Sequence, residues 1–90
     1  MNESDGYDNR RMRLVVWHAM KLGLKFARER AAPFNNLDDA LDVFGADLVP
    51  ELDAMIDSMT PRPSALLETS LYKSCLSGFL AAVAERGFKS

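Results

Sequence analysis

The chain has 90 residues with a formal net charge of −2, and 48% of its residues are hydrophobic. This length allows one domain with one hydrophobic core, and its single cysteine, Cys75, excludes an intrachain disulfide. The polar start of the sequence and the lack of a long apolar run predict a cytoplasmic protein with no membrane span.

Charge is distributed unevenly along the chain. Residues 9–32 contain seven bases and one acid, whereas residues 33–61 contain seven acids and no base. The simplest interpretation is that the basic and acidic helices lie side by side, within one chain or across a dimer.

A long first helix is predicted after a flexible tail at residues 1–8, so that residues 9–90 form a single helical domain. Asp8 or Asn9 can cap this helix, which runs to about Arg30 because Pro33 cannot continue it. Its apolar face contains Gly23, which would let another helix approach closely.

Two short helices are predicted next. Asn36 can cap a helix over 37–44, and Gly45 is placed to end it in the left-handed conformation. Asp47 can cap a third helix in which Pro50 is tolerated in the first turn. Apolar residues at helical spacing indicate which side of each short helix faces the core.

A second long helix is predicted at the end of the chain. Pro61 and Pro63 break the preceding helix, Ser64 can cap the new one, and Gly87 ends it after about Arg86. The expected fold is therefore all-α: a compact four-helix domain in which two long helices flank two short ones.

Small residues recur every four positions on this last helix, which permits close packing of two helix backbones. Inside one chain the partner helix would present Gly23, and between chains the same small residues would meet across a two-fold axis. We expect a homodimer, because a chain this short has few other ways to cover two long amphipathic helices. The predicted dimer-packing residues are Ser74, Gly78 and Ala82.

Catalysis and metal binding are not expected. The only histidine, His18, lies on the first helix, and Cys75 lies on the apolar side of the last helix, where it fits a buried hydrophobe. One histidine and one cysteine do not complete a closed zinc site, and the acids do not follow a calcium-loop pattern. We therefore expect no catalytic residue, no metal and no cofactor.

Nucleic-acid binding is the alternative function. The two short helices have about the size of a helix-turn-helix, but the second one carries acids that would repel phosphate. The basic first helix is the better candidate for such contacts, although the net charge of −2 argues against it.

Binding to another protein fits the first helix best. Its polar face combines arginine and lysine with tryptophan and leucine, and tryptophan and arginine are the residues enriched among the energetic anchors of protein interfaces. We expect a small regulatory or adaptor protein that acts by stoichiometric binding, for example an anti-activator that sequesters a transcription regulator or an inhibitor that blocks a larger complex. The alternative is that Trp17 and Leu24 are covered within the chain. The predicted partner-binding residues are Arg10, Arg13, Leu14, Trp17, Lys21, Leu24 and Arg28.

Overall fold

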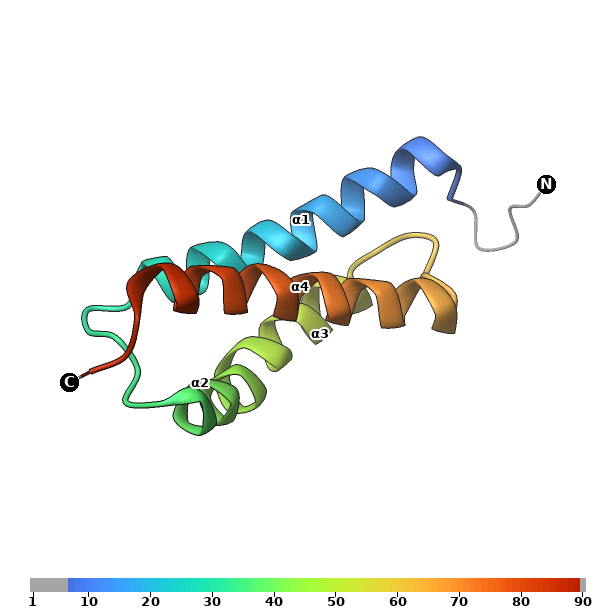
Figure 1. The fold of residues 1–90 in the computed structure, drawn as a ribbon. Helices are drawn as coiled ribbons and strands as arrows, with labels where there is room; N and C mark the ends of the chain where they lie inside the picture. The colour runs from blue at the N-terminus through green and yellow to red at the C-terminus, as the bar shows by residue number, and fades with distance from the viewer. Residues whose placement is uncertain (1–6, 90) are drawn as a thin grey trace.

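The computed structural model describes residues 7–89, and all regular structure in that range is helical (Figure 1). Two long helices, α1 (Asn9–Arg28) and α4 (Ala65–Arg86), are connected by one middle segment. That segment contains α2 (Leu37–Val43), a π-helical turn η1 (Phe44–Leu48) and α3 (Val49–Asp57). The all-α prediction is confirmed, but the two short helices form one joined unit rather than two separate helices.

The long helices α1 and α4 lie side by side and run in the same direction (Figure 1). At their first ends the Tyr7 hydroxyl donates a hydrogen bond to the Pro61 carbonyl oxygen, and at their last ends Arg28 pairs with Glu85. This parallel arrangement is possible because the middle segment carries the chain back to the beginning. The molecule is elongated, with extents of 51 × 20 × 18 Å.

Two glycines allow α1 and α4 to touch at the backbone. A Cβ atom added at Gly23 would lie 2.0 Å from the carbonyl oxygen of Cys75, and one added at Gly78 would lie 2.1 Å from that of Met20. No side chain fits at such distances. The loss of helix propensity at each glycine, about 1 kcal/mol relative to alanine, is the cost of this close approach.

The small residues of α4 are used within the chain. Gly78 and Ala82 are buried, and Ser74 is half-buried. Because Gly78 lies directly against the backbone of α1, it is not free to pack against a second copy. For Gly78 the intramolecular alternative holds, because it meets the Met20 backbone, so the predicted dimer contact through Ser74, Gly78 and Ala82 loses its central residue. A homodimer stays a prediction, and it would need another surface.

The middle segment differs from the sequence-based prediction at its centre. Gly45 does not end a helix, because the chain continues through η1, where the Val49 amide donates to the Phe44 carbonyl five residues earlier. Asp47 lies inside this turn, and α3 begins without a side-chain cap. Pro50 explains the distortion, since its ring lacks an amide hydrogen and would clash with the carbonyl four residues before it in a regular α-helix.

Aromatic and aliphatic side chains hold the middle segment against the long helices. Phe79 of α4 lies at the centre, with ring centroids 5.6 Å from Phe34 and 5.2 Å from Phe44. Leu48 and Leu52 are fully buried beside it. These large residues fill the space that the middle segment leaves, whereas glycines and alanines line the contact between α1 and α4. The core residues are Tyr7, Ala19, Ala27, Phe34, Ala40, Leu48, Leu52, Ile56, Leu67, Leu71, Cys75, Phe79, Ala82 and Val83.

Four of the predicted helix ends are confirmed. The Asp8 and Ser64 side chains cap α1 and α4 by accepting amide hydrogen bonds, and Gly87 ends α4 with φ at +76°. Asn36 likewise caps α2. Tyr7 does not belong to a flexible tail, because its ring is buried. The rest of the predicted tail, residues 1–6, lies outside the described residues.

The end of α1 is fixed by an arginine from α4. Arg86 donates hydrogen bonds to the Ala27 and Arg30 carbonyl oxygens at 3.0 and 2.6 Å. A cation at this position also interacts favourably with the negative end of the helix dipole. The helix stops at Arg28, two residues before the predicted end, and Arg30 packs over the Phe34 ring at 4.1 Å.

The glycine contact gives the first prediction. Gly23→Ala and Gly78→Ala should each lower the free energy of unfolding by at least about 2 kcal/mol, because the methyl group forces the helices apart. Gly45→Ala should raise it by about 0.5–1 kcal/mol, because Gly45 is helical and the added methyl group meets no atom within 4 Å. Urea unfolding followed by circular dichroism measures all three. Equal effects at the three glycines would contradict a close backbone contact between α1 and α4.

Candidate binding surface on the first helix

The solvent-exposed surface of α1 carries large apolar residues among cations, and Met20 lies at the edge of this surface, beside Gly78 of α4. The exposed fractions are 53% for Leu14, 50% for Trp17 and 40% for Met20. These residues recur at helical spacing over the first two thirds of α1, where the helix rises away from α4 (Figure 1). We call this surface the outer face of α1; it consists of Arg10, Arg13, Leu14, Trp17, Met20 and Lys21.

Trp17 is ordered by its neighbours on the same helix. The Lys21 ammonium lies 4.4 Å from the centre of the indole ring, within the range of a cation–π contact. The His18 ring lies 5.5 Å away and is tilted against the indole. These contacts restrain the indole ring while half of the residue stays exposed.

Two arginines of the outer face have unpaired charges. Arg10 and Arg13 are exposed and make no ion pair with any residue in the range 7–89. Arg28, which was grouped with them in the prediction, is bound instead to Glu85 through two hydrogen bonds of 2.9 and 3.1 Å. Leu24 is half-buried and packs against the core. The structure thus brings five of the seven predicted residues together on one exposed surface.

The segregation of charge seen in the sequence persists in the fold. Among the described residues, no ion pair joins α1 to the acidic middle segment. Asp57 pairs with Arg62, while Asp53 accepts a hydrogen bond from the Tyr72 hydroxyl and raises the pKa of Tyr72 to about 12. The basic and acidic helices therefore make no ion pair with each other within the described part of the chain, and their placement side by side across a dimer stays a prediction.

Five exposed large apolar residues in the described range were not predicted to be functional, and Met20 and Leu66 are two of them. Met20 was assigned to the buried face of α1, but it lies at the edge of the contact with Gly78 and remains 40% exposed. Leu66, at the start of α4, is 81% exposed. Helical periodicity places a residue on a face of its helix, but it does not say how far the neighbouring helix covers that face.

His18 and Cys75, the two residues considered for catalysis, lie in different environments. His18 is exposed on α1, whereas Cys75 is fully buried where α1 crosses α4. Burial raises the pKa of the Cys75 thiol to about 11, and nearby Glu51 adds to this effect. A buried neutral thiol is a poor nucleophile, which fits the predicted role of Cys75 as a small hydrophobe. Within the described range no three metal-ligating side chains come together.

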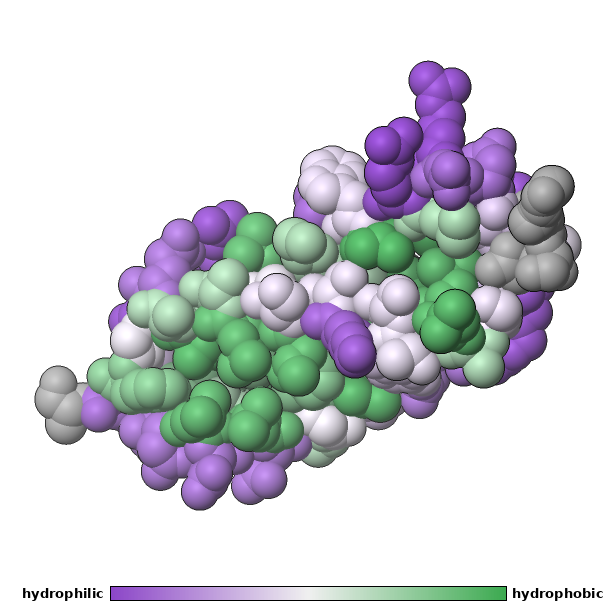
Figure 2. Space-filling model, turned by 45° about the vertical axis from the view of Figure 1, so that its right-hand side comes forward, coloured by the Kyte–Doolittle hydropathy of each residue, from purple (hydrophilic) through white to green (hydrophobic). Residues whose placement is uncertain are grey.

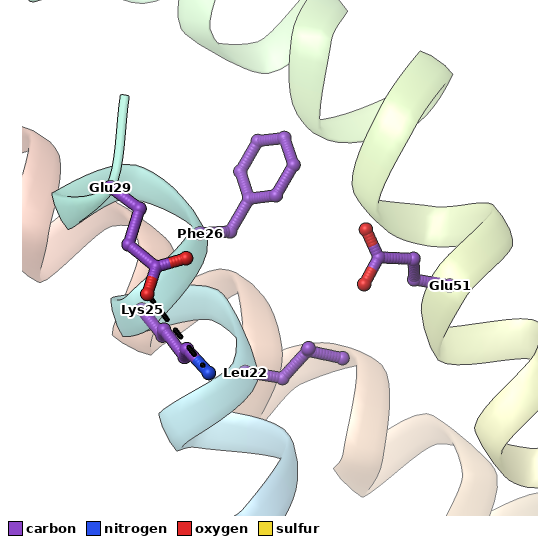
Figure 3. Close-up of a pocket in the computed structure, with 5 residues that line it drawn as sticks. All are labelled: Leu22, Lys25, Phe26, Glu29 and Glu51. Atoms are coloured by element: carbon purple, nitrogen blue, oxygen red, sulfur yellow. Dashed lines mark ion pairs between the residues drawn. The ribbon is translucent and has the colours of Figure 1, made fainter. Parts of the chain in front are cut away.

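A shallow hollow lies between α1 and α3. It has a volume of about 170 Å³ and is lined by Leu22, Lys25, Phe26, Glu29 and Glu51. In Figure 3 the Phe26 ring and the Glu51 carboxylate extend into it from opposite sides, with the Lys25–Glu29 ion pair at its edge. The volume is below the roughly 300 Å³ of the smallest typical ligand pockets. The Lys25–Glu29 ion pair at its edge is long, at 4.0 Å, and joins two exposed side chains.

Comparison with family models, curated proteins and solved structures found no match to this chain. The described helices include none with the length and apolar character needed to span a membrane.

The buried thiol gives the second prediction. The pKa of the Cys75 thiol is about 11 in the folded protein, against an ordinary value of 9.0. As the pH rises, the thiol therefore loses its proton in the unfolded chain before it does so in the folded protein. The stability contributed by the protonated thiol is complete below pH 9 and is lost as the pH rises through about 11.

Urea unfolding at several alkaline pH values measures this effect in the wild type and in Cys75→Ala. The slope of stability against pH should be shallower in the variant, and a thiol reagent should modify native Cys75 only as fast as the protein opens. Identical slopes together with rapid modification of the native protein would contradict burial.

Proposed function

We propose that this protein acts by stoichiometric binding to another protein through the outer face of α1, as a small regulatory or adaptor protein. The observation that carries the proposal is the half-exposed Trp17, held by Lys21 and flanked by Leu14 and Met20. A large restrained aromatic among exposed apolar residues is typical of the centre of a protein interface.

The charges around Trp17 indicate the kind of partner. Arg10 and Arg13 precede the apolar residues by about one turn of helix, and neither has an acid to pair with in the described part of the chain. An acidic partner surface with an apolar pocket complements this arrangement: the pocket takes the indole and the carboxylates pair with the arginines. An anti-activator or an inhibitor of a larger complex acts in this way, by occupying a functional surface.

Three further expectations remain part of the proposal. We propose a cytoplasmic location and a homodimer, the latter formed through a surface other than the small residues of α4. We also propose that the protein is not an enzyme. Nucleic-acid binding through the basic residues of α1 is the alternative, and its salt dependence separates it from the proposed function.

Capture of the partner from a lysate of the native host tests the proposal and gives the third prediction. Wild type should retain one protein that Trp17→Ala loses, since removal of an anchoring tryptophan costs at least about 2 kcal/mol, or roughly 30-fold in affinity. Leu66→Ala is the matched control, because it removes an exposed apolar side chain from α4 and leaves the outer face of α1 unchanged.

Three results would count against the proposal. One is capture of the same proteins by all three baits. Another is capture of nucleic acid that is released as the salt concentration rises, which supports the alternative function. The third is loss of the partner with Leu66→Ala but not with Trp17→Ala. Circular dichroism of each bait establishes beforehand that the variants fold.

A further inference from the structure

The short helix α2 exposes apolar side chains rather than burying them. Leu37 and Leu41 are 48% and 40% exposed, although Ala40 on the same helix is fully buried. The two leucines are four residues apart, so they lie next to each other on one side of α2. Figure 2 shows apolar side chains gathered over the part of the surface where α2 and the second half of α4 lie.

The end of the chain lies next to the same region. The Lys89 amide donates a hydrogen bond to the Phe34 carbonyl oxygen at 2.9 Å, which holds the last residues beside the loop that leads into α2. Phe88, the preceding residue, is 44% exposed. Three large apolar residues are therefore exposed at this end of the molecule, away from the outer face of α1.

Unpaired acids border these leucines. Asp38 and Asp42 are exposed on α2 and make no ion pair with the residues that the structure describes. Asp39 has a different role, because its carboxylate accepts a hydrogen bond from the Asn35 amide at the start of the helix. The negative charge is thus concentrated beside the exposed leucines, and Figure 2 shows hydrophilic side chains along the margin of the apolar area.

From this combination we propose that α2 is a second docking surface, which binds a basic amphipathic helix of a partner protein. Apolar residues of the incoming helix, spaced one turn apart, cover Leu37 and Leu41, and its lysines or arginines pair with Asp38 and Asp42. This surface has the opposite charge to the outer face of α1 and lies on a different helix. A chain with both surfaces joins an acidic partner to a basic one.

A model helix provides the test and the fourth prediction. The probe is a fluorescent peptide of about 18 residues, or about five helical turns, made of leucine on one face and lysine on the other. A second probe carries glutamate in place of lysine. Fluorescence anisotropy at an ionic strength of about 0.15 M, where the Debye length is about 8 Å, measures binding to the full chain.

The wild-type protein should bind the lysine probe and not the glutamate probe. The double variants L37S/L41S and D38N/D42N should each weaken binding by about tenfold or more. Leu66→Ser, which removes an exposed leucine outside this surface, and Trp17→Ala should both bind like wild type. Because the altered side chains are exposed, these variants should keep their circular dichroism spectra and their unfolding transitions.

The proposal is overturned by absence of binding to the lysine probe, or by equal binding to wild type and L37S/L41S, which would show attraction to negative charge alone. It is also overturned if ultracentrifugation shows a wild-type dimer that L37S/L41S converts to a monomer, because a second copy then covers α2. Retention of probe binding by Trp17→Ala makes the result independent of the function proposed for α1.

Discussion

The close backbone approach of α1 and α4 at Gly23 and Gly78 determines how the rest of the molecule is arranged. A Cβ atom at Gly23 would lie 2.0 Å from the Cys75 carbonyl oxygen, and one at Gly78 would lie 2.1 Å from that of Met20. The backbones of α1 and α4 can come this close only because both positions lack a side chain. Such a contact excludes water and buries Cys75, yet it covers only a narrow strip of each helix. The remaining faces of both helices are either covered by the middle segment or left exposed to solvent.

The middle segment covers one side of the helix pair and leaves the other open. Its large residues, including Phe44 and Leu48, pack around Phe79. On the open side, Leu14 and Trp17 of α1 remain about half exposed. Among the described residues, the acids of this segment make no ion pair with the cations of α1, and the unpaired charges of Arg10 and Arg13 lie on a different helix from those of Asp38 and Asp42. A binding role is consistent with both features, because exposed apolar area and unpaired charge add nothing to the stability of an isolated chain.

Much of the fold was predictable from local rules, and the errors have physical causes. Asp8, Asn36, Ser64 and Gly87 act at helix ends as their chemistry predicts. Gly45 and Asp47 carried equally good local signals, but Pro50 widens the turn and the chain stays helical. The outer face of α1 was predictable because cations and Trp17 share one side of the helix. The exposure of Met20 and Leu41 was not, since it depends on where the middle segment lies.

Oxidative footprinting of the protein, alone and in complex with its captured partner, tests the central claim most directly. Hydroxyl radicals oxidise exposed tryptophan and methionine side chains, and Trp17 and Met20 supply both types on the outer face of α1. Both residues should react readily in the free protein and be protected in the complex, while the exposed Leu66 should be oxidised equally in the two states. Unchanged oxidation of Trp17 and Met20 in the complex would show that the partner binds elsewhere and that the outer face of α1 is not the binding surface.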